Sequence, residues 1–152
     1  MMPEKYLEVN HAQGLGIIND AALTIRKQVF IAEQGVPTTI EIDGLDNQTE
    51  HYVGFLAGKP VTTARVAKDA ATQNWHIQRV ATLRDARGNG YAATLLKQII
   101  TDARNAHAQT LDLGAQVPAI GFYEKLGFVA EGPVFQEANI DHRHMIFTVE
   151  YS

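Results

Sequence analysis

The chain has 152 residues, of which 45% are hydrophobic and 20% are charged, and its formal net charge is -4. A chain of this size can bury one hydrophobic core, so we expect a single domain over residues 1–152. It has no cysteine, which excludes a disulfide framework, a thiolate metal site and a cysteine nucleophile. The acidic balance gives no general reason to expect nucleic-acid binding. Neither a signal peptide nor a membrane span is recognisable, so we expect a cytoplasmic protein.

The first third of the chain predicts a strand and then a helix. Residues 6–12 alternate as a strand does, and Asn19-Asp20 offer an N-cap for an amphipathic helix whose apolar positions run from Ala22 to Phe30. The segment 35–50 contains proline and glycine and is expected to be a loop or a short irregular helix. A hairpin follows, with strands at 52–57 and 61–67 around Gly58-Lys59-Pro60.

The next predicted strand, residues 74–83, changes its apolar phase along its length. Trp75 and Ile77 share one parity, whereas Val80 falls on the other. Because side chains alternate strictly between the two faces of a strand, such a switch predicts a one-residue β-bulge after Ile77.

The most informative stretch follows this strand and carries two glycines. Gly88 and Gly90 precede a helix whose apolar residues recur at helical spacing from Ala92 to Ala103. Unpaired N–H groups and the macrodipole at a helix N-terminus favour an anion, and glycine lets a phosphate approach the backbone closely. The loop therefore predicts binding of a phosphate-bearing cofactor.

Two interpretations of this loop compete. Gly88-x-Gly90-x-x-Ala93, with Asp112 about twenty residues later, fits the dinucleotide fingerprint of Rossmann folds. However, a Rossmann fold has this loop after the first strand of a βαβ series, whereas here the loop lies past the midpoint of the chain. Arg87-x-x-Gly90-x-Ala92 instead resembles the pyrophosphate loop of the GNAT superfamily of acyl-CoA N-acetyltransferases.

A second segment supports the GNAT resemblance independently. Residues 111–116 read as a strand, Pro118 suits the first turn of a helix and Gly127 suits its end. The phrase from Phe122 to Phe128, Phe-Tyr-Glu-Lys-Leu-Gly-Phe, looks like the late helix and helix-to-strand turn of GNAT enzymes. Its apolar members are explained by core packing alone, but the phenol of Tyr123 can also donate a proton.

The resemblance implies an α/β (α+β) fold, namely a twisted mixed, largely antiparallel sheet flanked by helices, in which the bulge admits the pantetheine arm. It implies that Val80, Ala81 and Thr82 present backbone groups to pantetheine and the thioester. Gln116 stands where the family often has asparagine. The residues implied to cradle the pyrophosphate are Arg87, Gly88, Asn89, Gly90, Tyr91, Ala92 and Ala93.

The final strands are expected at about 128–138 and 142–151. Residues 135–142 resemble the tail Phe-x-Glu-x-Gly-Ile-Pro-His of a narrower group of small bacterial GNAT proteins, with Asn139 and Asp141 in place of glycine and proline. That group's pattern is also matched earlier in the chain, by Glu33-Gln34-Gly35-Val36-Pro37, Asp43, Asp46 and His51.

The resemblance implies direct transfer of an acetyl group from acetyl-CoA to an amine of a small molecule or peptide. Tyr123 would protonate the departing thiolate, and Glu137 with His142 would hold or deprotonate the amine. Further candidates on the acceptor side are Glu33, Asp43, Asp46 and Glu50, although the acids of 41–50 fit a solvated loop equally well.

Several alternatives and partner questions remain open at this stage. A non-catalytic acyl-CoA-binding module is one alternative, and a Rossmann oxidoreductase is a more distant one. His142 and His144 lie two apart, but no third ligand is evident and no metal is expected. Neither nucleic acid nor a membrane is an expected partner, and a homodimer is compatible with the sequence, which does not decide the oligomeric state.

Overall fold

The computed structural model describes residues 6–151, and the seven strands within this range form one sheet in the order β1-β2-β3-β4-β5-β7-β6. Strands β4 and β5 are parallel, whereas the pairs β1–β2, β2–β3, β5–β7 and β6–β7 are antiparallel. The expected mixed, largely antiparallel sheet with helices is confirmed. A doubly wound parallel sheet is absent from the described residues, so the Rossmann interpretation of the glycine loop is wrong.

The strands are β1 (Leu7–Gln13), β2 (Glu50–Leu56), β3 (Lys59–Asp69), β4 (Asn74–Thr82), β5 (Thr110–Gln116), β6 (Val129–Glu137) and β7 (Ile140–Thr148). The α-helices are α1 (Ile17–Arg26), α2 (Thr38–Glu41), α3 (Tyr91–Asn105) and α4 (Ile120–Leu126). A π-helical segment, η2 (Lys27–Glu33), continues α1. Residues 6–151 also contain the short 3-10 turns η3 (Asp46–Gln48), η4 (Arg84–Ala86) and η5 (Val117–Ala119).

The chain divides into two compact units. Unit 1 comprises residues up to Val66 together with Arg79–Ile99, and unit 2 comprises Ala67–Gln78 and the chain from Ile100 onward. The strands β3 and β4 and the helix α3 pass from one unit into the other.

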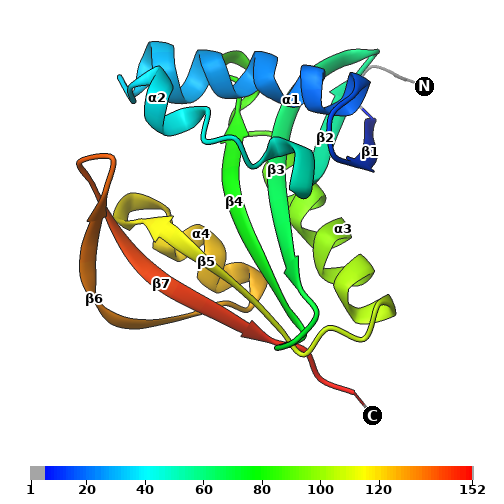
Figure 1. Cartoon of the computed structure of the whole chain (residues 1–152), viewed down its shortest axis with the longest axis vertical. Coiled ribbons are helices and arrows are strands. Elements are labelled where there is room, and N and C mark those ends of the chain that lie inside the picture. The colour runs from blue at the N-terminus through cyan, green and yellow to red at the C-terminus, as the bar shows by residue number, and fades with distance from the viewer. Residues whose placement is uncertain (1–5, 152) are drawn as a thin grey trace. The chain divides into compact units, whose positions relative to one another are not determined.

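In unit 1, α1 and η2 lie along the sheet formed by the first strands (Figure 1). Ala22, Ile25 and Val29 are buried against Val53 of β2 and Ala81 of β4. Burial of a side chain as large as Ile25 or Val29 stabilises the folded state by about 1.5–3 kcal/mol. This burial holds α1 and η2 on this face of the sheet. The amphipathic pattern of the sequence is thereby explained.

The N-terminus of α1 differs from the sequence expectation. The helix begins at Ile17 after Gly16, without a side-chain cap, and Asn19, expected near the N-cap, is buried inside the helix. The amide of Asp20 donates to the carbonyl of Gly16. Gly16 has φ 147, a conformation open to glycine, so the chain turns into the helix one turn earlier than the capping residues suggested.

The β2–β3 hairpin and the irregular strand β4 agree with the sequence pattern. Ala57 and Gly58 form the hairpin turn with φ 51 and 81, so Lys59 and Pro60, expected in the turn, belong to β3 instead. Within β4, Arg79 has φ 57, a left-handed conformation inside the strand, at the position where the apolar phase changes. The predicted segment 35–50 contains the short helix α2 and the turn η3.

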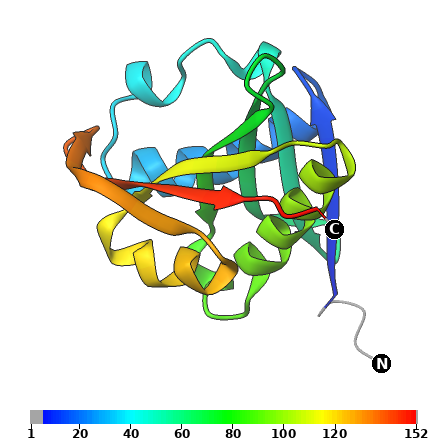
Figure 2. The same cartoon turned by 90° about the horizontal axis from the view of Figure 1, so that it is seen from below.

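In unit 2, β5, β7 and β6 lie side by side (Figure 2). The odd-numbered residues Leu111, Leu113 and Ala115 are buried, and Leu113 pairs with the buried Met145. The even-numbered residues of β5 face the other way and are polar or glycine, which defines a polar face of this sheet.

The last hairpin is tighter than expected. Ala138 and Asn139 take φ 52 and 62, a two-residue turn, so β7 begins at Ile140 rather than at 142. Asparagine tolerates this left-handed conformation where the resembling tail has glycine, so the replacement at Asn139 preserves a turn.

Candidate active site

The glycine loop in unit 1 exposes the first backbone amides of α3. Gly88 and Gly90 have φ 82 and 79, and a Cβ at either position would meet no atom within 4 Å. The amide of Thr94 donates to the carbonyl of Gly90, so the amides that precede it at residues 91–93 have no acceptor one turn back in the helix. The backbone here is open and suited to an anion, and a phosphate group therefore fits this loop.

Arg87 lies at the start of this loop and is held by two partners. Its Nε donates to the carbonyl of Thr82 at 2.9 Å, and its Nη2 donates to both carboxylate oxygens of Glu33 at 2.9 Å. The side chain of Arg87 is 44% exposed. The guanidinium is therefore fixed beside the strand end and the loop while remaining open to solvent.

The end of β4 is tied to β3 by side-chain and backbone hydrogen bonds. The Thr62 hydroxyl lies 3.2 Å from the carbonyl oxygen of Ala81 and 2.9 Å from the hydroxyl of Thr82. The Leu83 amide donates to the Val61 carbonyl. These contacts fix Ala81 and Thr82, which the GNAT resemblance assigns to thioester binding, while Val80 is half-buried on the same strand.

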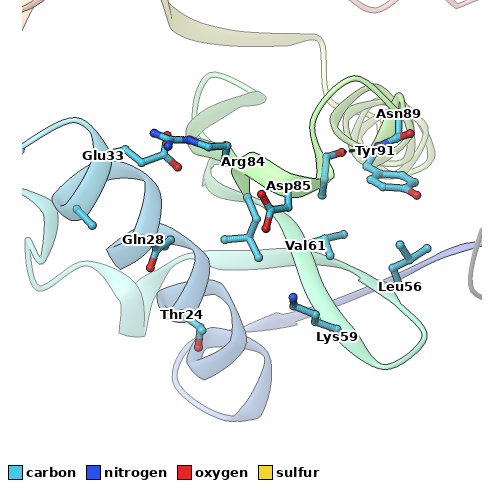
Figure 3. Close-up of a pocket in the computed structure, with 13 residues that line it drawn as sticks. Thr24, Gln28, Glu33, Leu56, Lys59, Val61, Arg84, Asp85, Asn89 and Tyr91 are labelled. Carbon is cyan, nitrogen blue, oxygen red and sulfur yellow. Dashed lines mark hydrogen bonds and ion pairs between the residues drawn. The ribbon is translucent and has the colours of Figure 1, made fainter.

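A cavity of about 780 Å³ opens beside the loop within unit 1 (Figure 3). Its volume is in the range of small-molecule sites. The helical segments α1 and η2, the β2–β3 hairpin and the loop surround it, and Arg84 extends toward Glu33 at 3.5 Å. The residues that line it are Thr24, Gln28, Ala32, Glu33, Leu56, Lys59, Val61, Leu83, Arg84, Asp85, Ala86, Asn89 and Tyr91.

Tyr123 lies in α4 of unit 2 and is only 7% exposed. Its ring makes edge contacts with Phe122 and Phe128, with centroids 5.0 and 5.9 Å away. Burial raises the pKa of the Tyr123 phenol well above its ordinary value, because the phenolate would lose its hydration. Tyr123 therefore keeps its proton at physiological pH.

Glu137 and His142, expected to hold or deprotonate the amine, share the polar face of unit 2. Gln116 is paired with His142 across β5 and β7, and the ring of His142 stacks on Phe135 with centroids 5.7 Å apart. The Nδ1 of His142 donates to the Ile140 carbonyl at 2.7 Å, so its Nε2 carries the lone pair in the neutral ring.

Glu137 lies on the same face, above Gly114. Its Oε2 is 3.8 Å from the position that a Cβ on Gly114 would occupy, and the ring of Phe135 is closer still at 3.1 Å. Glu137 is exposed, and its carboxylate has no hydrogen-bond partner among the described residues. A Cβ at position 114 would press on the Phe135 ring but would make only an ordinary contact with Glu137, so glycine there makes room for the ring.

Two of the acids named as acceptor-side candidates, Asp43 and Asp46, form ion pairs with buried arginines. Asp43 and Asp46 accept hydrogen bonds from the buried Arg65 at 2.7 and 2.9 Å, and Asp46 also accepts from the buried Arg26 at 2.9 Å. Asp46 is buried by these contacts, whereas Asp43 is paired but still exposed. We call these residues, with Glu41 and Arg79, the arginine cluster.

The arginine cluster joins the segment 38–46 to α1, β3 and β4. Glu41 binds the Nε of Arg26 at 2.6 Å and lies 2.7 Å from the Nε of Arg79. Hydrogen bonds from Arg65 lower the pKa of Asp43 to about 2, with burial acting in the opposite direction. The sequence signal for this cluster was the arginine in the middle of the apolar strand β3, since a buried cation needs carboxylate partners.

Three residues on the polar face of unit 2 form a network that the sequence pattern does not bring together. His76, Asp112 and His144 are joined by hydrogen bonds at 2.9 and 2.8 Å. The sequence pattern suggests Asp112 only as a ribose-binding acid and His144 only as a neighbour of His142. On its own strand, each of them is next to a buried apolar residue, Ile77, Leu113 or Met145, and this alternation is the signal that could have grouped them on one face.

The described part of the chain contains neither a metal-binding cluster nor a membrane-spanning helix. Within residues 6–151, no three His, Asp or Glu side chains converge in an arrangement that could hold a metal ion. None of the helices in that range combines the length and the hydrophobicity of a membrane span.

Comparison with known proteins identifies the family. The model of the acetyltransferase (GNAT) domain matches residues 12–149. The chain therefore belongs to the GNAT acetyltransferases and is an acyltransferase. It is 34% identical over 127 residues to YjcF, an uncharacterized N-acetyltransferase of Bacillus subtilis, with 82% of this chain and 89% of that protein covered.

Solved structures agree with this membership. An acyl-CoA N-acyltransferase from Pseudomonas aeruginosa is 27% identical with a TM-score of 0.82, over 94% of this chain and 100% of that chain. ElaA from Escherichia coli is 26% identical with a TM-score of 0.82, over 93% and 99% of the two chains. A Bacillus subtilis acetyltransferase solved in complex with CoA, 15% identical with a TM-score of 0.71 over 95% and 100% of the two chains, shares the fold.

Proposed function

We propose that this enzyme transfers an acetyl group from acetyl-CoA to the amine of a small molecule or peptide by direct attack. The observation that carries the proposal is the loop before α3, where Gly88 and Gly90 have positive φ and leave open space over the first helical amides. In this proposal, residues 87–93 hold the pyrophosphate, and Val80, Ala81 and Thr82 together with Gln116 contact the pantetheine arm and thioester.

Acetyl-CoA, when bound, supplies an activated carbonyl that a neutral amine can attack. Strand amides near Thr82 would stabilise the negative charge that develops on the carbonyl oxygen. Tyr123 would deliver a proton to the departing sulfur, a role supported by the burial that keeps its phenol protonated. No covalent intermediate on the enzyme is needed, which accords with the lack of cysteine.

On the acceptor side we propose that Glu137 and His142 hold the amine. Glu137 is the support for this assignment, because it is an exposed carboxylate without a protein partner among the described residues. His142 lies on the same face, at the register position opposite Phe135. An unpaired carboxylate beside an aromatic ring suits a cationic amine.

Two measurements test the function. Calorimetric titration with CoA, acetyl-CoA and NAD(H) asks which cofactor binds, and we expect saturable binding of the first two only. Release of free CoA is then followed with a panel of polyamines, amino sugars, amino acids and peptide N-termini, with identification of the acetylated product. Tight CoA binding without acetylation of any amine would favour a non-catalytic acyl-CoA-binding module, and binding of NAD(H) alone would refute the proposal.

A further inference from the structure

The polar face of unit 2 carries a chain of hydrogen bonds centred on Asp112. Its Oδ1 accepts from Asn74 Nδ2 at 2.8 Å and from His76 Nδ1 at 2.9 Å, and its Oδ2 accepts from His144 Nε2 at 2.8 Å. The Thr110 hydroxyl donates to Asn74 Oδ1 at 2.8 Å, which fixes the amide so that its NH₂ points at Asp112. Asp112 is thus a fixed acceptor with three donors around it.

Asp112 is ionised in this arrangement. Its partial burial acts to raise the pKa of the carboxyl, but hydrogen bonds from His76, Asn74 and His144 together hold that pKa well below its ordinary value. An ionised carboxylate only accepts, so both histidine nitrogens that contact it must carry protons. The protonation state of the His76 and His144 rings then depends on which group contacts the second nitrogen of each ring.

His144 meets a second carboxylate. Its Nδ1 lies 3.1 Å from Glu131 Oε2, so both ring nitrogens donate and the ring is an imidazolium. The hydrogen bond to Asp112 is the largest cause that raises the pKa of His144. Because both of its nitrogens are already protonated, His144 cannot accept a proton from a substrate.

His76 differs from His144 at this second nitrogen. Asp112 holds the proton of His76 on Nδ1, and Nε2 has no hydrogen-bond partner among residues 6–151. The side chain of His76 is 41% exposed. The lone pair on Nε2 is therefore available, and the carboxylate behind the ring would stabilise the imidazolium formed when that nitrogen takes a proton.

The charges on the polar face fit an amine. Carboxylates come from Asp112 on β5 and from Glu131 and Glu137 on β6, and histidines come from β4 and β7. On β3, Lys68 lies over the ring of Trp75, 4.5 Å from its centroid, and Trp75 belongs to the opposite face of β4. His142 differs from His76 in two respects: it is only 8% exposed, and its Nδ1 contacts a neutral carbonyl instead of a carboxylate.

We propose that His76 Nε2 accepts the proton that the acceptor amine loses, with Asp112 as the positioning residue for the ring. This inference rests on the proposed N-acetyltransferase function. As the new N–C bond forms and the C–S bond breaks, the amine proton passes to His76 Nε2, and Tyr123 protonates the sulfur. His76 then releases its proton to solvent and Tyr123 regains one, so the net reaction converts amine and thioester into amide and thiol.

The test compares pH profiles of kcat/KM for the wild type, His76→Gln and Asp112→Asn with one amine from the panel. We expect the wild-type profile to rise through the titration of a histidine, and His76→Gln to lose that limb and about 10²-fold or more in kcat/KM. The kcat/KM of Asp112→Asn should lie between that of the wild type and that of His76→Gln. Acetyl-CoA affinity should stay within about twofold of the wild type in both variants, and His107→Asn serves as a matched histidine control.

Nitrogen-15 NMR of the imidazoles adds a readout that needs no turnover. His76 should be an Nδ1–H tautomer in the wild type and a mixture in Asp112→Asn. An active wild type whose rate and pH profile survive His76→Gln would overturn the role of His76, as would an Nε2–H tautomer. A wild type that binds acetyl-CoA but acetylates no amine would instead contradict the proposed function itself.

Discussion

Arg87 and Glu33 form a bidentate ion pair, in which one guanidinium nitrogen lies 2.9 Å from each carboxylate oxygen. The pair joins the first residue of the glycine loop to the end of η2, fifty-four positions earlier in the chain. Glu33 also lines the cavity beside the loop. A carboxylate thus lies where the proposed pyrophosphate would compete with it for the same cation.

Arg87→Ala should weaken CoA binding by about tenfold, and Glu33→Gln should tighten it by a few-fold at low salt. Arg87→Ala removes charge-assisted hydrogen bonds to the pyrophosphate of about 1.5–3 kcal/mol, a loss that hydration of the phosphate partly offsets. Glu33→Gln removes a negative charge that repels the pyrophosphate. Calorimetry at two salt concentrations measures both. If Glu33→Gln weakened binding as much as Arg87→Ala, the ion pair would be a support for the loop and not a competitor.

Gly90→Val should weaken acetyl-CoA binding by tenfold or more and leave the fold intact. A side chain at φ 79 costs about 1–2 kcal/mol, and its Cβ would enter open space that we assign to the pyrophosphate. Gly132→Val is the matched control, because Gly132 has φ 75 and equally open surroundings but lies in β6. Equal loss of affinity in the two variants would remove the loop from the binding site.

The sequence predicted the fold well where a local pattern carries the information. The alternation in β5, the apolar spacing in α3 and the left-handed Gly127 after α4 are set by burial and turn chemistry within a few residues. The start of α1 was misplaced, because Gly16 permits a turn that cap preferences do not anticipate.

The networks of the molecule were less predictable than its elements. The pairing of Arg26 with Glu41 and Asp46, and of His76 with Asp112, joins residues 15 to 36 positions apart. Such contacts depend on strand register and on how a loop folds back, which no local pattern encodes. The ion pairs of Asp43 and Asp46 with buried arginines are therefore a finding of the structure that the sequence pattern does not predict.

The arginine cluster predicts a specific loss of stability in acid. The pKa of Asp43 is lowered to about 2 in the folded protein, from 3.8, chiefly by hydrogen bonding to Arg65. A depressed carboxyl pKa stabilises the folded state above the unfolded pKa, and that stability is lost as the pH falls from about 4 to 2.

Asp43→Asn should therefore lower the free energy of unfolding by about 1–2 kcal/mol at pH 7, allowing for partial exposure, and should converge with the wild type near pH 2. Urea unfolding at several pH values measures this. The control is Asp69→Asn, which removes an exposed carboxylate that accepts from the Ala71 amide. A constant difference between Asp43→Asn and the wild type across pH 2–7 would contradict the linkage.

Glu137→Gln and His142→Ala should raise the KM for the amine by about tenfold, with little change in acetyl-CoA affinity. Glu137 would lose its charge, and His142→Ala would remove the ring that stacks on Phe135. Steady-state kinetics with one amine, together with CoA titration, separate the two substrates. Glu124→Gln, on the exposed surface of α4, is the control. Unchanged kinetics in both variants would leave Glu137 and His142 without a role in acceptor binding.

Tyr123→Phe tests the proposed proton donor most directly, since it keeps the ring packed against Phe122 and Phe128 and deletes only the hydroxyl. A thiol has an ordinary pKa of about 8.5 and a phenol about 10, and burial raises the pKa of Tyr123 further, so proton transfer is uphill unless it accompanies cleavage of the C–S bond. We expect turnover to fall by about 10- to 1,000-fold, in the range of positioned acid catalysis or somewhat below it. Acetyl-CoA affinity should change little, because a loss confined to turnover marks an interaction made in the transition state. Tyr151→Phe deletes a hydroxyl that binds the Ala108 carbonyl and should leave turnover unchanged. If chemistry limits the rate and Tyr123→Phe still turns over like the wild type, Tyr123 is a packing residue and the sulfur takes its proton from solvent.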